Sequence, residues 1–577
     1  MSKLSFDQKT IRLLLEDKKA DFLIPDYQRP YAWEEKECQT LWDDFFMFAF
    51  PDEGRGAFNR NDEYFLGPIV TFRNNQNKLE IIDGQQRLTS IMLLLRAFYA
   101  KYEKMKDENS QIARKNIEKC IWKTDEFEKP DKEALKIDSE VAMENDKDEF
   151  IKILKTGEVS GEMNSKYAKN YLFFQDQIST FFNEFHSLFD YFPMRILNNC
   201  FLLPIETEDQ DTALRIFSTL NDRGKPLSDA DIFKAQFYKY YSSKGEKDSF
   251  MDKWRALEVT CDEIFKPLTG TSMDELFTRY MYYERAKTGV RTSTTEALRK
   301  FYEKNNYALL KNDYILDNLA LLANFWKDVT EQNSQRFSNR ILKKLFVLNY
   351  APNSMWTYFV SVYFMQNKDE QGLLDEENFF DFLNKTIGFV WGYAFTNPGV
   401  NALRTPLFTE MINIVNGKVV DFGEFKFDKN ELEIAIRNYR FLNGRPITKS
   451  MLTFWAYNRD DQQLLSLKDK FDIEHIYAKQ RAIKDGITDF DFVDWLGNKS
   501  LLEKGINGSA GDYHFADKKR LYKEGSTKKP GATKVEDLLY IADSYKEFNK
   551  VDIETRNDDI IQGFLNFVES LGLIDAK

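Results

Sequence analysis

The chain has 577 residues, a formal net charge of −12 and an ordinary globular share of apolar side chains. This length predicts about three to five domains, and the acidic balance excludes a protein that coats DNA uniformly while leaving a local basic groove open. The four cysteines form no CxxC pair, so neither a disulfide framework nor a structural zinc site is expected. The sequence has no signal-peptide core and no membrane-spanning run, which predicts a reduced, cytoplasmic protein with no membrane partner.

An extended aromatic segment, residues 22–33, follows a short amphipathic helix predicted over 6–17. Its two prolines disfavour helix and keep the chain extended. Gln28 and Arg29 lie between aromatic residues, a composition suited to holding a base, a phosphate or a partner strand. The alternative is a surface connection with a stacked arginine.

A β-hairpin is predicted next, after a helix over 34–48. Its strands span 63–72 and 78–82, and Asn74–Asn77 make the turn between them. The second strand leads directly into a polar turn and then into a long, mostly buried helix. The hairpin therefore delivers the polar turn to one fixed place in the fold.

That polar turn is Asp83-Gly84-Gln85-Gln86-Arg87. A strand that passes directly into a helix leaves free N–H groups at the helix start, and these groups and the helix dipole favour an anion. Asp83 suits a helix cap or a metal-bound water, Gly84 permits a close backbone approach, and the two glutamines offer amide hydrogen bonds. Arg87 lies in the first turn, where a cation opposes the dipole unless it serves a ligand. The alternative is a capped helix whose arginine pairs locally.

A second polar turn, containing Asn221 and Arg223, is predicted between two helices. Gly224 is a natural helix stop, and Ser228 and Asp231 have the spacing of a capping box. A short strand at 134–137 and a buried strand at 201–205 precede it. A well-capped joint between helices, without a ligand, explains the same residues.

Residues 245–450 are predicted to be predominantly helical and rich in aromatic side chains, with no group of residues typical of a catalytic site.

A second chemical centre follows. A predicted strand over 471–476 presents Glu474 and His475, and Asn498 and Asn507 follow nine residues apart. A histidine can deprotonate water, and carboxylate and amide oxygens suit Mg²⁺, which stabilises charge on a scissile phosphate. These residues suit a one-metal nuclease. A structural histidine is the alternative for His475.

Positive residues that suit a DNA-binding groove follow this centre. A solvated loop is the alternative, since glycine, serine and proline interrupt the segment. The candidates are Lys518, Lys519, Arg520, Lys523, Lys528 and Lys529.

Both ends of the chain resemble the GmrSD-type, modification-dependent (type IV) restriction enzymes and their phage-defence relatives. The middle of the chain carries no recognisable motif. The N-terminal resemblance rests on four ordered motifs, which are residues 24–33, 65–67, 83–89 and a pattern running from Phe217 to Ala235. The C-terminal resemblance rests on residues 472–476, 496–498, 501–502, 506–507 and 515–519.

The resemblance implies an α+β, mostly helical chain. A ParB/sulfiredoxin-like domain that binds and hydrolyses a nucleotide is expected over 1–244, followed by a helical middle domain over 245–450. An HNH (ββα-metal) nuclease domain is expected over 451–545, and a C-terminal helix over 546–577.

The resemblance also implies roles for single residues. In the nuclease, His475 would be the general base, Glu474 and Asn507 would hold Mg²⁺ or Mn²⁺, and Asn498 would hold the loop or orient the histidine. Many HNH enzymes have Asp where this chain has Glu474. The nucleotide site would be lined by Asp83, Gly84, Gln85, Gln86 and Arg87, together with Gln28, Arg29, Asn221 and Arg223.

The function implied is anti-phage defence by cleavage of modified phage DNA, licensed by GTP, ATP or CTP. A homodimer would let two nuclease domains cut both strands. The alternative is an N-terminal domain that senses modified DNA or a partner without hydrolysing a nucleotide, and so controls the nuclease.

Overall fold

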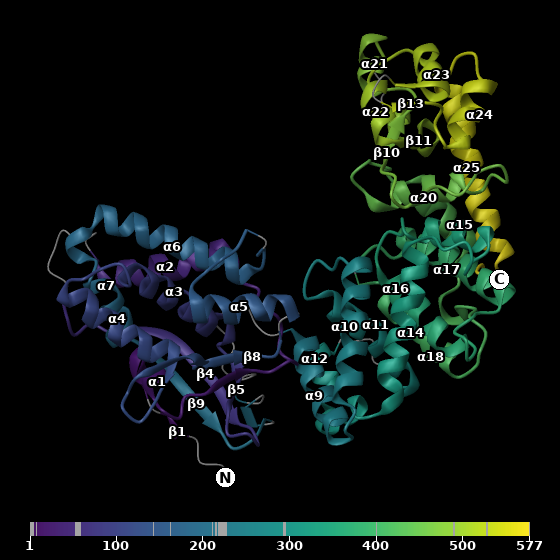
Figure 1. The fold of residues 1–577 in the computed structure, drawn as a ribbon. Helices are drawn as coiled ribbons and strands as arrows, with labels where there is room; N and C mark the ends of the chain where they lie inside the picture. The colour runs from purple at the N-terminus through teal and green to yellow at the C-terminus, as the bar shows by residue number, and fades with distance from the viewer. Residues whose placement is uncertain are drawn as a thin grey trace. The chain divides into compact units, whose positions relative to one another are not determined.

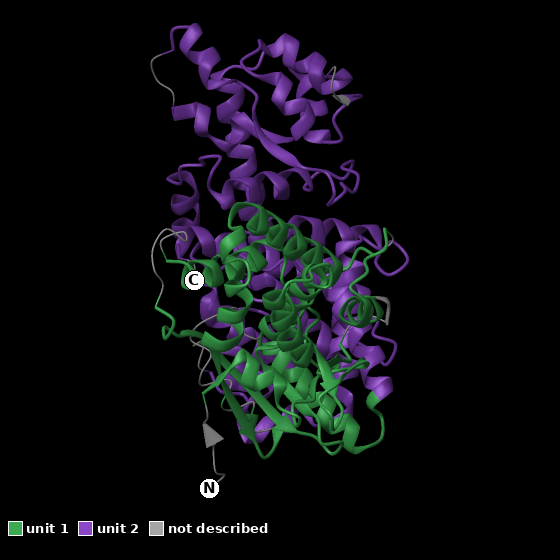
Figure 2. Ribbon diagram, turned by 60° about the vertical axis from the view of Figure 1, so that its left-hand side comes forward, with its two compact units in different colours: residues 1–247 green, residues 248–577 purple. Residues whose placement is uncertain are grey.

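The chain forms two compact units, residues 1–247 and 248–577, seen in the computed structural model (Figure 2). Within the described residues, no helix is long and apolar enough to cross a membrane. The structure describes residues 5–575 except for 7, 52–58, 142–143, 162, 211, 214–215, 217–227, 292–295, 400, 488–490 and 527–528.

The N-terminal unit contains a mixed sheet (Figure 1). Its described strands have the order β1-β9-β4-β5-β3-β8. β2 pairs with β9, and β6 and β7 form a separate ladder. The strands are β1 Ser5–Phe6, β2 Lys9–Thr10, β3 Phe22–Ile24, β4 Tyr64–Arg73, β5 Leu79–Asp83, β6 Trp122–Thr124, β7 Pro130–Leu135, β8 Ile137–Ser139 and β9 Cys200–Thr207.

Helix α3 is the centre of this unit, because its residues from Leu88 to Tyr99 are all buried. It packs against α4 and α6, and its apolar run gives it no solvated face. The helical segments are α1 Ile11–Glu16, α2 Glu35–Ala49, α3 Gln85–Tyr102, α4 Glu108–Ile121, α5 Glu144–Thr156, α6 Lys166–Glu184, η1 His186–Leu188, α7 Tyr191–Asn199 and α9 Asp229–Ser243.

The predicted hairpin is confirmed as the antiparallel pair β4–β5. Asn77 has a φ of 61° in the turn, a left-handed conformation that asparagine tolerates better than most residues. β4 also pairs in parallel with β9, and β5 pairs in parallel with β3. β5 therefore lies between β3 and β4, and its last residue, Asp83, pairs with Val70 of β4.

Two predicted elements have different bounds in the structure. The helix expected over 6–17 is shorter, because Thr10 caps α1 by accepting a hydrogen bond from Leu13 N and the preceding residues pair with β9. The strand expected over 134–137 is interrupted at Lys136. That residue turns between β7 and β8, and its ammonium group donates to the Asp17 carbonyl at 2.8 Å.

The C-terminal unit is mostly helical, which confirms the helical prediction for residues 245–450. Its first part contains α10 Lys247–Ile264, α11 Ser272–Lys287, α12 Leu298–Tyr302, α13 Lys304–Tyr307, η2 Ala308–Leu310, α14 Asp313–Thr330, α15 Asn339–Leu348, α16 Met355–Asn367, α17 Glu376–Thr396, α18 Arg404–Val415, η3 Gly423–Phe425, α19 Lys429–Arg437 and α20 Pro446–Ala456.

The rest of this unit is built around the antiparallel hairpin β10–β11 (Figure 1). Helix α22 follows β11 directly and packs on both strands, while α25 packs on η5, α17 and α19. The elements are β10 Phe471–His475, α21 Lys479–Lys484, η4 Asp491–Asp494, η5 Leu496–Asn498, β11 Lys499–Glu503, α22 Lys504–Ala510, α23 Phe515–Glu524, β12 Gly525–Ser526, β13 Lys529–Pro530, α24 Glu536–Ser544 and α25 Lys550–Ser570.

Candidate nucleotide and nuclease sites

The turn before α3 depends on Gly84, which caps the helix with a φ of 91°. A Cβ atom there would lie 3.0 Å from Ile69 Cγ1, in addition to the strain of a left-handed backbone. The turn therefore requires glycine both for its conformation and for its close approach to β4.

The two glutamines of the motif bind the backbone of the aromatic segment. Gln86 Oε1 accepts hydrogen bonds from Ala32 N at 2.6 Å and Trp33 N at 3.3 Å, and its Nε2 donates to the Pro30 carbonyl at 3.1 Å. Gln85 Nε2 donates to the Arg29 carbonyl at 3.3 Å. Both side chains are buried, so they join the two predicted motifs into one structure.

Arg87 lies against the third motif. Its Nη1 donates to the Pro68 carbonyl at 3.3 Å. A Cβ atom on Gly67, whose φ is 113°, would lie 3.1 Å from the same nitrogen. Gly67 thus leaves the space that the guanidinium occupies, and burial lowers the pKa of Arg87 against the opposing effects of Asp83 and Tyr64.

A pocket of about 450 Å³ opens beside Arg87. It contains two arginines, aromatic rings and two carboxylates, and its volume lies in the range of small-molecule sites. The lining residues are Arg29, Ala32, Trp33, Glu37, Thr40, Leu41, Asp44, Tyr64, Phe65, Leu66 and Arg87.

Several buried polar atoms near this motif make no hydrogen bond within the described part of the chain. They are Gln28 Oε1, Arg29 Nε and Gln85 Oε1. Gln28 is otherwise fixed, because its Nε2 donates to the Ile82 carbonyl at 3.3 Å. Burial also raises the pKa of Asp83 above its ordinary value. Polar atoms left unpaired in a protein interior are costly and mark a place suited to a ligand.

Asn221 and Arg223 lie outside the described residues. The helix after them begins as predicted, because Ser228 Oγ accepts from Asp231 N at 3.1 Å and Asp231 Oδ2 accepts from Ser228 N at 3.0 Å. This reciprocal pair confirms the capping box.

The second candidate site is at the end of β10, where His475 pairs with Lys499 of β11. Its Nε2 lies 3.9 Å from Asp494 Oδ1, and its side chain is one quarter exposed. Burial, followed by the charge of Lys499, lowers the pKa of His475 to about 4, although Asp494 opposes the shift. The imidazole is therefore neutral at pH 7, the form that can accept a proton.

Glu474 lies on the opposite face of the strand from His475, because successive side chains of a β-strand alternate. It is 4 % exposed, and its Oε1 accepts hydrogen bonds from Lys518 Nζ at 2.7 Å and Tyr522 Oη at 2.8 Å. The structure thus places the predicted metal ligand in a buried ion pair, away from the exposed side of the imidazole.

Asn498 fixes the loop that follows β10. It is fully buried, its Oδ1 accepts from Tyr477 N at 2.7 Å, and its Nδ2 donates to the carbonyls of Tyr477 and Val493. These side-chain contacts hold the loop, which is one of the two roles predicted for Asn498.

The glycine before it has a packing role. A Cβ atom on Gly497 would lie 2.0 Å from the Ile553 carbonyl oxygen of α25. Arg556, on the same helix, donates to the carbonyls of Leu496, Gly497 and Lys499 and pairs with Asp537 at 2.6 Å. The predicted C-terminal helix is therefore an integral support of the hairpin.

Asn507 lies on α22, partly exposed, and no described contact occupies its side chain. Within the described ranges, no three His, Cys, Asp or Glu side chains are grouped closely enough to hold a metal ion by themselves. The carboxylate found near His475 is that of Asp494, which is not one of the predicted metal ligands.

Two family models match the chain. The N-terminal domain of GmrSD restriction endonucleases matches residues 11–238, and the C-terminal domain of the same enzymes matches residues 427–562. The chain belongs to the GmrSD restriction endonucleases. No curated protein matches it.

As a GmrSD restriction endonuclease, the protein acts in defence and has DNA as its substrate.

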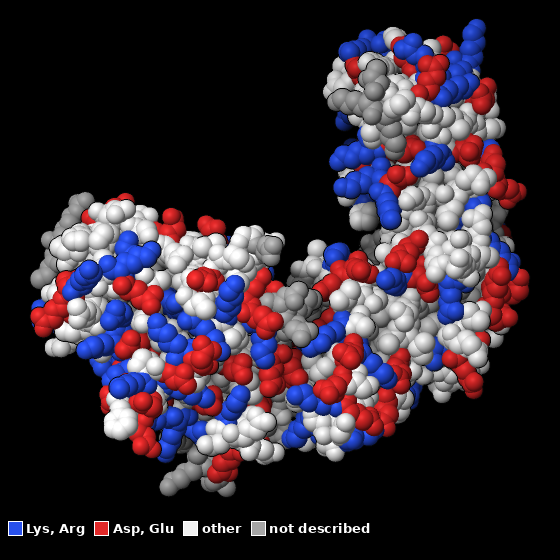
Figure 3. Space-filling model, viewed as in Figure 1, with Lys and Arg blue, Asp and Glu red and all other residues white. Residues whose placement is uncertain are grey.

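The cations predicted to bind DNA differ in how exposed they are to solvent. Lys518 is fully buried, and its ammonium group donates to Glu474 and to the His475 carbonyl, so the structure does not place it on a DNA-binding surface. Lys519 Nζ donates to the Tyr545 carbonyl at 2.6 Å, while Arg520 is exposed. Lys and Arg side chains also gather on the surface beside α20 and β10 (Figure 3).

Lys499 and Asp494 form the part of this GmrSD site that sequence reasoning missed. Lys499 is fully buried, donates to the Phe441 carbonyl and lies 3.4 Å from Asp494. Each residue looks like an ordinary charged position in the sequence. The sequence feature that could have pointed to them is their place next to the Leu496-Gly497-Asn498 motif.

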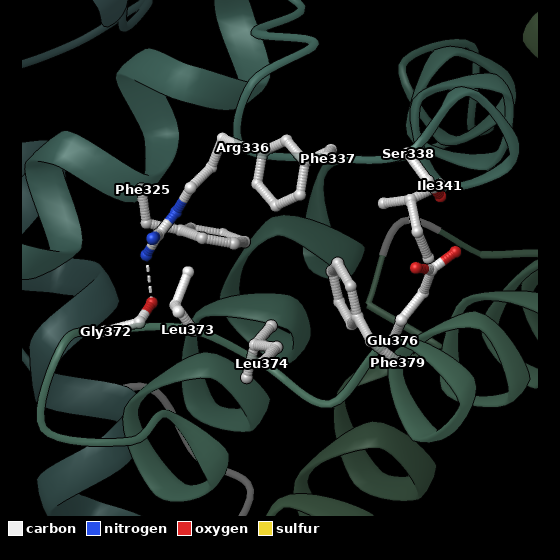
Figure 4. A pocket seen from close by; sticks show the side chains of 10 residues that line it. All are labelled: Phe325, Arg336, Phe337, Ser338, Ile341, Gly372, Leu373, Leu374, Glu376 and Phe379. Carbon is white, nitrogen blue, oxygen red and sulfur yellow. Dashed lines mark hydrogen bonds between the residues drawn. The ribbon is translucent and has the colours of Figure 1, made fainter.

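A smaller pocket, of about 110 Å³, lies between α14, α15 and α17 (Figure 4). Phe325, Phe337 and Phe379 line it, and Arg336 donates to the Gly372 carbonyl beside it. Its volume is below that of small-molecule sites, and its walls are mostly aromatic and aliphatic. It is a gap in the packing of the middle helices.

Proposed function

We propose that this GmrSD enzyme is an NTP-regulated, metal-dependent endonuclease that cleaves modified foreign DNA with His475 as the general base. The observation that carries the proposal is the neutral, partly exposed imidazole at the end of a strand–strand–helix arrangement, β10, β11 and α22. This order of elements is that expected of an HNH (ββα-metal) nuclease.

The protein's own groups would divide the work. His475 would accept the proton of the attacking water, which is the task of a general base. The buried contacts of Asn498 hold the loop after β10, and Lys499 holds Asp494 beside the imidazole. These contacts fix the base before substrate binds, which reduces the cost of orienting it.

A divalent ion fits the donor set in part. Mg²⁺ commonly takes one or two protein carboxylates and keeps several waters. Asp494 supplies a partly exposed carboxylate beside His475, although its Oδ1 also pairs with Lys499, and Asn507 supplies an amide oxygen on α22. Glu474 is buried in its pair with Lys518. We therefore propose Asp494 and Asn507 as ligands in place of Glu474 and Asn507. When bound, the metal would stabilise the charge that develops on the scissile phosphate.

A nucleotide fits the N-terminal pocket. Arg29 and Arg87 would pair with phosphates, since arginine presents several donors in a planar fork. The aromatic rings of Trp33, Tyr64 and Phe65 in the same lining offer faces on which a base can stack. GTP, ATP and CTP all have this chemistry, so the proposal names the class and not the base.

The first test is cleavage of plasmid DNA and modified phage DNA with Mg²⁺ or Mn²⁺, with and without each NTP. We expect His475→Ala to lower the rate by about 100- to 10,000-fold, because it removes the general base. Undiminished cutting by the variant would overturn the assignment. A dependence of wild-type cutting on one NTP would establish the coupling.

A second candidate function is an N-terminal module that senses modified DNA or a partner without nucleotide turnover. The favouring observation is that Gln85 and Gln86 bind the protein's own backbone. Arg87→Ala separates the two functions. Under the leading proposal it abolishes phosphate release and leaves some metal-dependent cutting, whereas unchanged phosphate release favours the sensor.

A further inference from the structure

Arg440 lies beside the nuclease site although it belongs to the segment predicted as the helical middle domain. It follows α19 and precedes α20, in a connection between two helices of that region. Its Nη2 lies 3.8 Å from Asp494 Oδ2. The other oxygen of the same carboxylate lies 3.9 Å from His475 Nε2. A single carboxylate therefore separates the guanidinium from the proposed base.

A buried lysine fixes the position of this connection. Lys499 is fully buried, and its ammonium group donates to the carbonyl of Phe441, the residue after Arg440. The same group lies 3.4 Å from Asp494 Oδ1. Phe441 is itself 4 % exposed and packs edge-on to Phe395, with ring centroids 5.9 Å apart. The backbone at Arg440 is thus attached to the same strand that faces His475.

The side chain of Arg440 is open to solvent. It is 70 % exposed, and the pair with Asp494 at 3.8 Å is longer than a charge-assisted hydrogen bond. An exposed pair of this length contributes little to stability. The guanidinium therefore keeps donors for an incoming anion, on a backbone that is already held in place.

We infer that Arg440 binds a phosphate of the DNA backbone at the His475 site, with Asp494 positioning it. The inference rests on the proposed nuclease function and adds the residue that seats the substrate. An arginine beside the base would draw a phosphodiester towards the attacking water, because its planar fork matches two phosphate oxygens. The residue comes from outside the predicted nuclease region, so that region alone lacks this contact.

The test uses full-length protein and a DNA substrate that the wild type cuts. We expect Arg440→Ala to lower kcat/KM by about 10- to 100-fold, the range for losing a hydrogen bond to a charged group. Arg440→Lys keeps the charge without the fork and should recover part of the loss. A wild-type kcat/KM in Arg440→Ala would overturn the inference.

The salt dependence of DNA binding is a second measurement, and a purely structural role of Arg440 would not change it. We compare DNA affinity over a range of salt concentrations for His475→Ala and for the double variant His475→Ala/Arg440→Ala. Loss of one phosphate contact should reduce the salt slope by about 0.9. An unchanged slope in the double variant would contradict a phosphate contact.

The matched control is Arg437→Ala. Arg437 lies three residues earlier on α19, and its guanidinium pairs with Glu433 at 2.8 Å and Asp558 at 2.7 Å. Its loss removes the same charge without touching the His475 site, and cutting should stay near wild type. An equal loss in both variants would show a general charge effect and overturn the specific contact.

The two proposals fail in different ways. Wild-type cutting by His475→Ala would overturn the nuclease assignment whatever Arg440 does. Loss of cutting in His475→Ala, with wild-type rate and salt slope for the Arg440 variants, would overturn the phosphate contact alone.

Discussion

The two candidate sites hold their motif residues in different ways. At the start of α3, a contiguous polar motif turns inward, and Gln85 and Gln86 bind the backbone of residues 29–33. At the end of β10, the exposed groups come from separate segments, at Arg440, His475 and Asp494. A contiguous motif therefore builds the frame of the first site, while long-range packing assembles the second.

The two sites also differ in whether their buried polar groups have partners. The N-terminal motif leaves buried polar atoms unpaired within the described residues, at Gln28 and Gln85. The hairpin has paired buried charges, Glu474 with Lys518 and Arg556 with Asp537. Unpaired buried atoms suit a site completed by a ligand, whereas paired charges suit a support that must hold without one.

The largest expected effect concerns the support of the hairpin. Gly497→Ala should lower the free energy of unfolding of the C-terminal unit by about 4 kcal/mol or more, because the added Cβ meets backbone atoms of α25 that no side-chain rotation can move. Gly508→Ala, which meets nothing within 4 Å, is the control. Urea unfolding measures both, and similar stabilities would mean that α25 does not approach the turn this closely.

Next in size is the buried ion pair. Lys518→Met should cost about 3–5 kcal/mol, since it leaves the Glu474 carboxylate buried without its cation. Burial already raises the pKa of Glu474, so the folded state binds the proton more readily than the unfolded state. Loss of Lys518 removes a charge that lowers the pKa of Glu474, so this pKa is higher still in the variant. The cost should thus be fully present above the pKa of Glu474 in the variant and shrink as the pH falls through it.

Urea unfolding between about pH 5 and 8 checks this prediction. Lys519→Met, one residue on, is the control because its lysine donates to the Tyr545 carbonyl and lies 5.6 Å from the Phe515 ring centroid, without a described carboxylate partner. A loss in Lys518→Met that does not vary with pH would contradict an unpaired carboxylate as its cause.

A smaller effect is expected in the N-terminal frame. Gln86→Ala should destabilise the N-terminal unit by about 2–3 kcal/mol, because Ala32 N and Trp33 N lose their acceptor. NTP binding should weaken with it, since the same segment carries Arg29. Gln39→Ala, which removes an exposed hydrogen bond to Asp43, is the control. If Gln86→Ala keeps the wild-type NTP affinity, the hydrogen bonds of Gln86 are not needed for nucleotide binding.

The smallest effect lies away from both sites. Burial lowers the pKa of Lys344 to about 8, and its ammonium group lies 5.6 Å from the ring centroids of Phe380 and Phe567. Lys344→Met should stabilise the C-terminal unit by about 1 kcal/mol at pH 7, where the buried charge is costly. The gain should shrink above about pH 8, because the wild-type lysine then loses its proton in the folded state. Urea unfolding of the wild type and Lys344→Met at pH 7 and above pH 8 measures the gain.

The opposite orientation of Glu474 and His475 can be predicted from the sequence alone. The strand over 471–476 was predicted, and alternation along a strand places Glu474 and His475 on opposite faces. One of the two had to face the core. The sequence does not say which lysine will be buried with it, because Lys518 is 44 residues away and the pairing depends on how α23 packs.

Local structure follows from residues that are close together in the chain. A continuous apolar run after a glycine turn favours α3, a capping box begins α9, and an asparagine-rich turn favours the β4–β5 hairpin, because these signals lie within a few residues of each other. Which charged groups are buried and which face solvent depends on tertiary packing. The positions of Lys499, Asp494 and Arg440 follow from contacts between distant segments, and burial there depends on packing that no local pattern encodes.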